Sequence, residues 1–282
     1  MVLPLIKSFV GAPLADPIDG FEHALSFGVV TATAGTIEVA DPNGYKVVFD
    51  GSFTVVGGAI SSGTMTGFTV FAGATKIMTG AGYAVDGAAL YDALQHFNDD
   101  DEPFFNLVFD IPIKFVGSGK GDAFQTEAGG SKLLGKGGND ALFSEGGLGT
   151  VIKGGNGNDI VATLDGGAKF WGNSGKDTFL FLLDSLQPMT SHNRIKDFVR
   201  GEDHIGLAVP DDVLTPGYLD KAHFHKGTSA TKAEHMIIYD KKSGIAYFDA
   251  DGSGAGAQFA FAKVDPGTKL GVDDFYVQSF IG

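Results

Sequence analysis

Four aspartates recur at nearly constant spacing in the middle of the chain: Asp122, Asp140, Asp159 and Asp177. The intervals between them are 18, 19 and 18 residues, and each aspartate follows a glycine-rich stretch. Carboxylates and the carbonyl oxygens of tight turns are hard oxygen ligands, which Ca²⁺ prefers. The first chemistry that these residues predict is therefore the binding of calcium.

The segments that contain the aspartates are copies of one nine-residue pattern. Residues 154–162 (GGNGNDIVA) match G-G-x-G-x-D-x-U-x, where U is a large apolar residue, without a mismatch. Residues 135–143 and 172–180 are good partial copies, and residues 117–125 are a weaker one. Glycines suit such turns because they adopt positive φ angles that side chains disfavour.

Degenerate nonamers without the aspartate alternate with these copies, at 126–134, 144–152 and 163–171. The eighth position of all seven nonamers is apolar: Phe124, Leu133, Leu142, Val151, Val161, Phe170 and Phe179. The step is nine residues, with one extra residue near Lys153. A glycine-rich linker would not keep this period. Two nonamers make a coil of about 18 residues, and stacked coils form a parallel β-roll with the apolar residues inside.

The array resembles the RTX, or hemolysin-type, calcium-binding repeats. The resemblance implies about three Ca²⁺ ions between corresponding turns of adjacent coils, along the aspartate edge. On the opposite edge Ser131, Gly149 and Ala168 replace aspartate, so we expect no metal there. The implied ligands stand at positions one, three and six of each copy: Gly117, Gly119, Asp122, Gly135, Gly137, Asp140, Gly154, Asn156, Asp159, Gly172, Ser174 and Asp177.

Composition limits the classes of function. The 282-residue chain has a net charge of −14, which disfavours nucleic acids and anionic membranes as partners. Its carboxylates repel one another until a cation neutralises them, so we expect folding to be coupled to calcium. The chain has no cysteine, which excludes disulfides and thiol catalysis. No apolar run is long enough for a transmembrane helix.

Residues 1–116 are predicted to form a β-rich domain of unknown activity. Runs of β-branched and aromatic residues predict strands at 28–31, 36–40, 45–56, 64–72 and 76–79. Asp50-Gly51 lies between two apolar runs and predicts a tight turn.

One helix is predicted in this region, at residues 87–97, with Asp86 as its N-cap and Ala89, Leu90, Leu94 and Phe97 on one face. A long strand is predicted at 104–116. The acidic segment 98–102 is interpreted as a solvated loop, with a calcium site as the less favoured alternative.

Residues 182–282 are predicted to cap the roll, whose own bounds are 117–181. The segments 177–181, 193–198 and 201–207 follow one another as in the C-terminal half of serralysin-type RTX domains, which they resemble. Asp197 and Asp203 fall on aspartates of that pattern. Turn capping and an additional calcium site both remain open for these two residues.

Residues 237–254 resemble a second RTX-associated block, with a turn at 242–244 between two apolar runs. Asp249, Asp251 and Gly252 resemble the start of an EF-hand loop, but no acidic residue completes that loop. We interpret the segment as a hairpin turn, with a metal site as the less favoured alternative.

Export is implied by both ends of the chain. The N-terminus does not read as a signal peptide, and the acidic then apolar tail 272–282 resembles type I secretion signals. We therefore expect a secreted, extracellular protein that uses the type I secretion machinery.

No catalytic motif stands out. The chain has no H-E-x-x-H, no G-x-S-x-G and no nucleotide-binding motif that ends in Lys-Ser/Thr. His223 and His225 would share a face of a strand, as exposed histidines or, less favoured, as a transition-metal pair. No pair of carboxylates is singled out for glycoside hydrolysis.

The sequence therefore predicts an all-β protein with one or two short helices, which is a secreted calcium-binding RTX protein without enzyme activity. Its N-terminal region would bind an extracellular polysaccharide or a cell surface. The alternative is a small polysaccharide hydrolase, lyase or epimerase with its site in residues 1–116. Membrane perturbation is disfavoured, because long amphipathic helices are absent.

Overall fold

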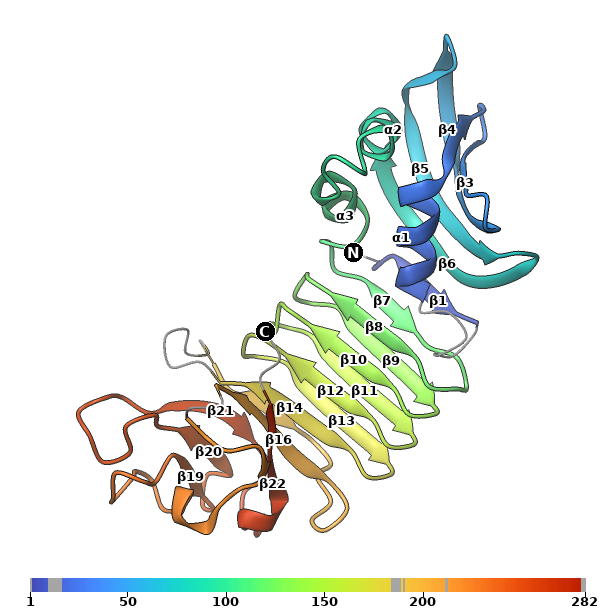
Figure 1. Cartoon of the computed structure of the whole chain (residues 1–282). Helices are drawn as coiled ribbons and strands as arrows, with labels where there is room; N and C mark the ends of the chain where they lie inside the picture. The colour runs from blue at the N-terminus through green and yellow to red at the C-terminus, as the bar shows by residue number, and fades with distance from the viewer. Residues whose placement is uncertain (1, 10–16, 184–188, 190, 211–212, 280–282) are drawn as a thin grey trace. The chain divides into compact units, whose positions relative to one another are not determined.

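The computed structural model describes residues 2–9, 17–183, 189, 191–210 and 213–279 (Figure 1). The chain forms two compact units, residues 1–138 and 139–282, and the boundary falls inside the repeat array. The described residues are mostly β-strand, with three short α-helices and a β-roll, so the predicted all-β class is confirmed.

The first unit contains an antiparallel meander, in which each strand pairs with the next. Its strands are β2 (Val29–Ala32), β3 (Thr36–Ala40), β4 (Tyr45–Val56), β5 (Ala59–Ala72) and β6 (Thr75–Asp86). A further strand, β1 (Leu5–Ser8), pairs antiparallel with β6 and parallel with β7 (Lys114–Val116). The predicted strands of this region are present, and β5 and β6 are longer than predicted.

Phenylalanines fill the core between this sheet and its helices. Phe21 comes from α1 (Pro17–Phe27), Phe49 and Phe68 come from the sheet, and Phe104 comes from α3 (Glu102–Val108). The ring of Phe21 lies 4.9 Å from that of Phe68 and 5.9 Å from that of Phe104, centroid to centroid. Burying one such side chain contributes about 1.5–3 kcal/mol, so this cluster holds helices and sheet together.

The turn predicted at Asp50-Gly51 is wrong. Both residues lie inside β4, where the register with β5 shifts at a bulge. A Cβ on Gly51 would lie 2.4 Å from the Phe53 ring, so glycine is needed here for space. The hairpin turn comes later, at Gly57 and Gly58, whose φ angles are 63° and 89°.

The predicted helix is confirmed as α2 (Gly87–Gln95), and Asp86 Oδ1 accepts the Ala89 N–H at 2.8 Å. Ala89 itself is exposed, and Ala93 takes its place on the buried face. The long strand predicted at 104–116 is wrong, because α3 occupies its first part and β7 only its last three residues. Pro103 starts α3, as proline often does in a first helical turn.

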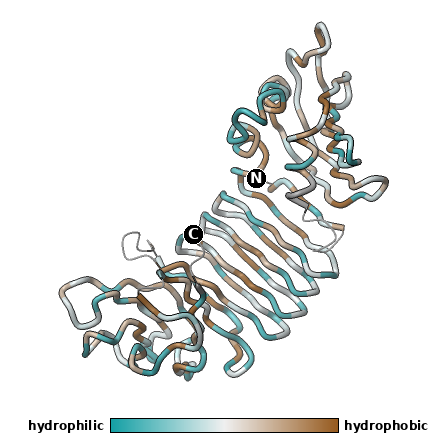
Figure 2. Tube along the Cα trace, viewed as in Figure 1, coloured by the Kyte–Doolittle hydropathy of each residue, from teal (hydrophilic) through white to brown (hydrophobic). Residues whose placement is uncertain are grey.

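The second unit contains most of the roll. Its coils contribute parallel strands alternately to two sheets. One sheet contains β10 (Ala141–Ser144), β12 (Ile160–Thr163), β14 (Thr178–Leu182) and β16 (His204–Val209), and the other contains β11 (Val151–Asn156), β13 (Lys169–Ser174) and β15 (Asn193–Ile195). In the first unit, β7 and β9 (Lys132–Gly137) pair in parallel in the same way, and β8 (Ala123–Thr126) lies between them in the sequence. Hydrophobic strands alternate with hydrophilic turns along the roll (Figure 2).

The apolar series of the roll is confirmed except at one position. Leu142, Val161, Phe170 and Phe179 are buried, but the buried residue in the fourth nonamer is Ile152 rather than Val151. Ile152 is in register with Phe170. The extra residue therefore lies in the turn before Thr150, not near Lys153, and Thr150 rather than Gly149 corresponds to Ala168.

Among the remaining strands of the second unit, three form antiparallel hairpins. β19 (Ile237–Asp240), β20 (Ile245–Phe248) and β21 (Phe259–Lys263) are antiparallel neighbours, and the predicted turn at 242–244 is confirmed, with a φ of 76° at Gly244. The other elements are β17 (Gly217–Tyr218), β18 (Phe224–Lys226), β22 (Phe275–Ser279) and 3-10 turns at Lys221–His223 and Val272–Asp274. Of these, β18 pairs parallel with β19, and β22 pairs parallel with β16. Among the described residues, no helix has the length and apolar character needed to cross a membrane.

Candidate metal centre

The aspartates of the second unit form a hydrogen-bonded ladder along one edge of the roll. Asp159 Oδ1 accepts the backbone N–H of Asp140 at 2.8 Å, and Asp177 Oδ1 accepts that of Asp159 at 2.9 Å. The same bond links Asp203 Oδ1 to the N–H of Asp177 at 3.0 Å. All four side chains are at most 3% exposed. The ladder therefore uses one oxygen of each carboxylate to tie a coil to its neighbour.

The second carboxylate oxygen of the two middle rungs is buried without a hydrogen-bond partner. This holds for Oδ2 of Asp159 and Oδ2 of Asp177. Each oxygen lies against the first glycine of its own nonamer, so that a Cβ on Gly154 or Gly172 would meet it at 2.2 Å. Glycine at position one therefore provides room for the carboxylate. A buried anionic oxygen without a donor is costly, and a cation would compensate it.

Positive φ angles occur at positions two and four of the nonamer. Position four is glycine in Gly138, Gly157 and Gly175, and position two is Gly155 in the perfect copy. The other two copies place Lys136 at φ 80° and Asn173 at φ 68° there. The turn conformation is thus kept even where the sequence lacks the glycine that would adopt it without strain.

Adjacent turns of the second unit stack directly on each other. Asn158 accepts the N–H of Lys176 through its side chain, and the side chain of Asn139 accepts the N–H of Asn158, both at 2.9 Å. A Cβ on Gly175 would lie 1.9 Å from the carbonyl oxygen of Gly157. The carbonyl-rich backbones of neighbouring turns are therefore close enough to face a common ion.

The last rung of the ladder, Asp203, differs from the middle rungs. Asp203 Oδ2 accepts the N–H of Val199 at 2.7 Å. In the first unit, Asp122 Oδ2 accepts the N–H of Ser118 at the same distance. Asp197 accepts the N–H groups of Gly172 and Asn173, one with each oxygen. Asp197 and Asp203 therefore cap turns with both carboxylate oxygens.

Burial shifts the titration of these carboxyls. It raises the pKa of Asp203 to about 6, above the ordinary value for aspartate. It also raises the pKa of Asp159, and that of Asp177, where the charges of Asp159 and Asp197 add to the effect. Without a counter-ion, the ladder therefore resists ionisation.

The opposite edge of the second unit carries neutral residues at the corresponding positions: Thr150, Ala168 and Asn193. Asn193 Oδ1 accepts the N–H of Ala168 at 2.9 Å, as an aspartate does on the other edge. In the first unit, Ser131 Oγ accepts the N–H of Ile113 at 3.1 Å. This edge therefore satisfies its backbone without charge.

The predicted ligand positions lie together in the turns. In three of the four copies positions one and three lie at the end of a strand, whereas Gly117 and Gly119 follow β7; in all four copies the position-six aspartate directly precedes the next strand. Asn156 and Ser174, both at position three, are paired in register. No three His, Asp or Glu side chains cluster around a common point in the described part of the chain. A cation at these turns would take one carboxylate oxygen from each rung and its other ligands from backbone carbonyls, which fits Ca²⁺.

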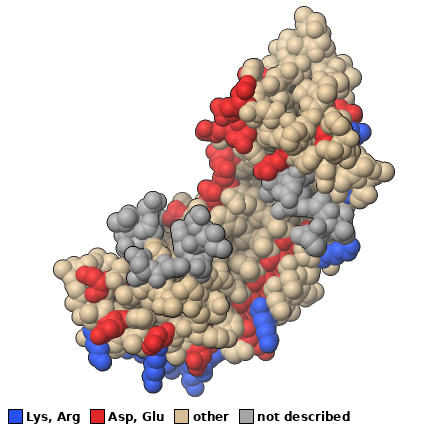
Figure 3. Space-filling model, viewed as in Figure 1, with Lys and Arg blue, Asp and Glu red and all other residues tan. Residues whose placement is uncertain are grey.

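The geometry does not support a metal site at the acidic segment 98–102 or at His223 and His225, where the sequence left one open as a less favoured alternative. The acidic segment after α2 is solvated, and acidic side chains gather on the surface there (Figure 3). His223 ends a 3-10 turn, so it does not continue the strand of His225. His225 instead stacks on His235, with ring centroids 4.5 Å apart.

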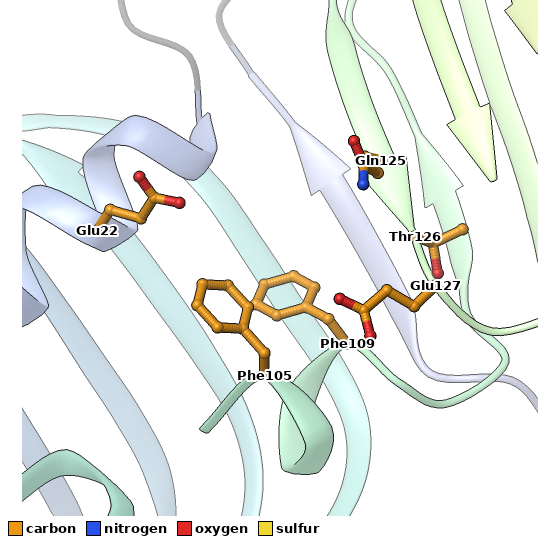
Figure 4. Close-up of a pocket in the computed structure, with 6 residues that line it drawn as sticks. All are labelled: Glu22, Phe105, Phe109, Gln125, Thr126 and Glu127. Carbon is orange, nitrogen blue, oxygen red and sulfur yellow. The ribbon is translucent and has the colours of Figure 1, made fainter. Parts of the chain in front are cut away.

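A pocket of about 270 Å³ lies in the first unit, and sequence reasoning did not find it (Figure 4). Phe105 and Phe109 lie side by side on one wall, with Glu22 of α1 and Glu127 on either side of them. Thr126 also lines the pocket, and its buried hydroxyl has no hydrogen-bond partner. No sequence motif predicts this pocket, because its residues come from segments about 20 to 105 positions apart in the chain.

Comparison with known proteins identifies the family of the roll. Residues 133–276 match the family described as peptidase M10 serralysin C terminal, whereas no curated protein and no solved structure matches the chain. The match includes three of the aspartate turns, the capping residues Asp197 and Asp203, and the hairpins that follow. Since just over half of the chain matches, the protein belongs to the serralysin C-terminal family, whose RTX repeats generally bind Ca²⁺.

Proposed function

We propose that the roll binds about three Ca²⁺ ions along its aspartate edge and that these ions are structural. The observation that carries the proposal is the buried, unpartnered Oδ2 of Asp159 and of Asp177. The ligands are the aspartates of the four copies, with main-chain oxygens at positions one and three. These are the twelve residues named from the sequence.

Export provides the physical setting for such a site. The serralysin C-terminal family is typically secreted. In a compartment with little free calcium, the repulsion among the carboxylates opposes folding of the roll. Outside the cell, calcium binding supplies the missing free energy, so export and folding are coupled. In this proposal the type I machinery recognises the tail 272–282, of which residues 272–279 are described.

The proposed role of the folded protein is interaction rather than catalysis. The roll uses its carboxylates for structure, and the N-terminal unit supplies the contact with an extracellular polysaccharide or a cell surface. Support comes from the sheet and pocket of that unit, which stand outside the segment that matches the family.

The calcium proposal is tested by adding Ca²⁺ to chelated protein. We expect an increase in β-type circular dichroism and a higher melting temperature, because a ligand that binds only the folded state stabilises it. Mg²⁺ at the same concentration serves as the control, since its strict octahedral geometry and firmly held waters suit these turns poorly. An unchanged spectrum and melting temperature after calcium addition would refute the proposal.

A second candidate function is favoured by the pocket in the first unit. Two phenyl rings beside two carboxylates suit a sugar ring, which stacks on aromatic faces and donates hydroxyl hydrogen bonds to acidic oxygens. The pocket supports either binding of a polysaccharide or, with Glu22 and Glu127 as the acid pair, its cleavage.

Calorimetry with a panel of neutral and acidic oligosaccharides distinguishes these possibilities. Phe105→Ala should abolish binding of any sugar, whereas Glu127→Gln should leave binding but abolish product formation if the protein is an enzyme. A panel without binding to the unaltered protein counts against this second candidate.

A further inference from the structure

A second group of unpartnered oxygens lies outside the aspartate ladder, in the loop between β20 and β21. Asp249 follows β20 directly and is 6% exposed. Its Oδ1 is buried without a hydrogen-bond partner, and so is Oε1 of Gln258. Both residues line one cavity of about 440 Å³.

Other hydrogen bonds hold the side chain of Gln258 and the backbone of Asp249. The amide nitrogen of Gln258 donates to the carbonyl oxygen of Thr228 at 2.8 Å, so its oxygen is the atom left for the cavity. The N–H of Asp249 donates to the carbonyl oxygen of Met236 at 2.9 Å. Two residues that line the same cavity therefore each hold a buried acceptor oxygen without a hydrogen-bond partner, which is an unfavourable arrangement unless a cation compensates it.

The loop that carries Asp249 is held firmly by glycines. Gly252 has a φ of 59°, and a Cβ there would meet the carbonyl oxygens of Ala233 and Lys232 at 2.3 and 2.5 Å. The N–H of Ser253 donates to the same carbonyl of Lys232 at 3.0 Å. The loop is thus pinned against a neighbouring backbone segment, and this gives the cavity a defined shape.

Asp251 adds a second carboxylate beside the first. Its Oδ2 accepts the N–H of Gly256 at 2.9 Å, and a Cβ on Gly254 would meet that oxygen at 2.1 Å. Asp251 therefore folds the glycine-rich part of the loop around its carboxylate. This arrangement leaves its negative charge close to the cavity.

We propose that this loop binds one additional Ca²⁺ ion, ligated by Asp249 Oδ1, Gln258 Oε1 and carbonyl oxygens of the glycine-rich loop. All of the available donors are oxygens, which excludes the soft or imidazole sites preferred by Zn²⁺ and Cu²⁺. The Gln258 amide oxygen supplies a ligand at the end of a loop that lacks the glutamate of an EF-hand. The ion would lock the β20–β21 hairpin independently of the roll turns.

Calcium stoichiometry of the full chain, measured by equilibrium dialysis, tests the proposal. Asp249→Asn combined with Gln258→Leu should remove one ion, while Asp159→Asn combined with Asp177→Asn should remove ladder ions and leave this one. Asp240→Asn, an acid-to-amide change in the preceding turn, is the matched control and should remove none. Unchanged calcium stoichiometry in the Asp249/Gln258 variant overturns the proposal of a loop site. It leaves the proposal of calcium at the aspartate turns unaffected.

A second measurement covers the case in which that variant does not fold. In the unaltered chain, Ca²⁺ should slow amide hydrogen exchange in peptides spanning residues 249–258. Gln258→Glu should raise calcium affinity at this loop about tenfold or more and should lower the melting temperature only when calcium is absent. Exchange in this loop that is indifferent to Ca²⁺, or a Gln258→Glu variant destabilised equally with and without Ca²⁺, contradicts the proposal.

Discussion

The two edges of the roll in the second unit solve the same structural problem with different chemistry. On one edge the side chains of Asp159 and Asp177 accept the N–H of the preceding coil, and on the other edge Asn193 does so at the same distance as Asp177. A neutral amide is therefore sufficient to join coils. The negative charge of the aspartates is not needed to form that bond, and without a cation the burial of that charge is unfavourable.

The difference indicates what the aspartate edge is for. The backbone pattern is the same on both edges, since the carbonyl of Asp159 accepts the N–H of Thr178 as the carbonyl of Ala168 accepts that of Arg194. Between the two edges, as far as the described residues of the second unit show, buried oxygens without a donor occur on the aspartate edge. The proposed binding of Ca²⁺ would account for the charge, and variants that move charge from one edge to the other test this account.

The largest effect is expected from neutralising the aspartate edge. Asp159→Asn with Asp177→Asn keeps one oxygen for each ladder bond but removes both charges. Calcium stabilisation should fall by about 2.7 kcal/mol per site lost, for an ion present at a hundred times its dissociation constant. Melting curves with and without Ca²⁺ measure this loss.

Asp165→Asn on the opposite edge is the control for this variant and should leave the calcium response unchanged. In the absence of calcium the double variant should be at least as stable as the unaltered protein, because a buried charge has been removed. If the double variant keeps the full stabilisation by calcium, the claim that the two edges differ in calcium binding is wrong.

The reverse exchange should make the neutral edge behave like the charged one. Asn193→Asp keeps the acceptor for the N–H of Ala168 but adds a negative charge to a fully buried position. We expect destabilisation of about 1–3 kcal/mol or more at neutral pH. Denaturant unfolding at pH 7 and pH 4.5 measures it, and the loss should shrink at the lower pH, where the new carboxyl is protonated.

The stability of the calcium-free protein should depend on pH in a way that the buried aspartates determine. Burial raises the pKa of Asp159, Asp177 and Asp203 in the folded state, in the last case to about 6. The folded state therefore binds more protons than the unfolded state between the ordinary aspartate pKa and about pH 6. Stability should fall as the pH rises through this window and level off above it.

Thermal melting in a chelator across pH 4 to 7.5 checks this dependence. Saturating Ca²⁺ should reverse the slope, because protons then compete with the ion for the carboxylates. A calcium-free protein that becomes more stable as the pH rises from 4 to 6 would contradict the assignment of buried, unpartnered carboxylates.

The smallest effect concerns turn conformation rather than charge. Lys136 and Asn173 hold positive φ angles that glycine adopts freely. Lys136→Gly should stabilise the protein by about 0.5–1 kcal/mol, with a smaller gain for Asn173→Gly, because asparagine tolerates this region better. Gly155→Ala, at the same turn position, should be destabilising, and chemical denaturation in calcium compares the three variants.

Sequence periodicity was sufficient to predict the roll but not its register. The nine-residue step placed six of the seven apolar residues correctly. It failed at Val151 because Ile152, equally apolar, follows directly, and only the pairing with Phe170 distinguishes the two. The positions of the aspartate turns were predictable because the copies of the nonamer repeat the same spacing of glycine and aspartate. The partnerless state of Oδ2 was not, since it depends on neighbouring coils.

Elsewhere the sequence was ambiguous or silent. The helix α3 was mistaken for a strand because Phe104, Phe105, Val108 and Phe109 form an apolar run that suits either element. In the loop between β20 and β21, the sequence indicated a metal site at Asp249 and Asp251 only as a less favoured alternative. Gln258 was not predicted, because it lies nine residues from Asp249 and only the fold places both residues at one cavity.

The closed end of the ladder at Asp203 implies that the stack has a built-in stop. There the N–H of Val199, four residues earlier in the chain, occupies the second carboxylate oxygen. This terminal rung resists the addition of another coil, much as a polar capping repeat terminates a solenoid. Insertion of 18-residue units in the interior would lengthen the array, whereas the same units added beyond Asp203 would meet a carboxylate that is already saturated.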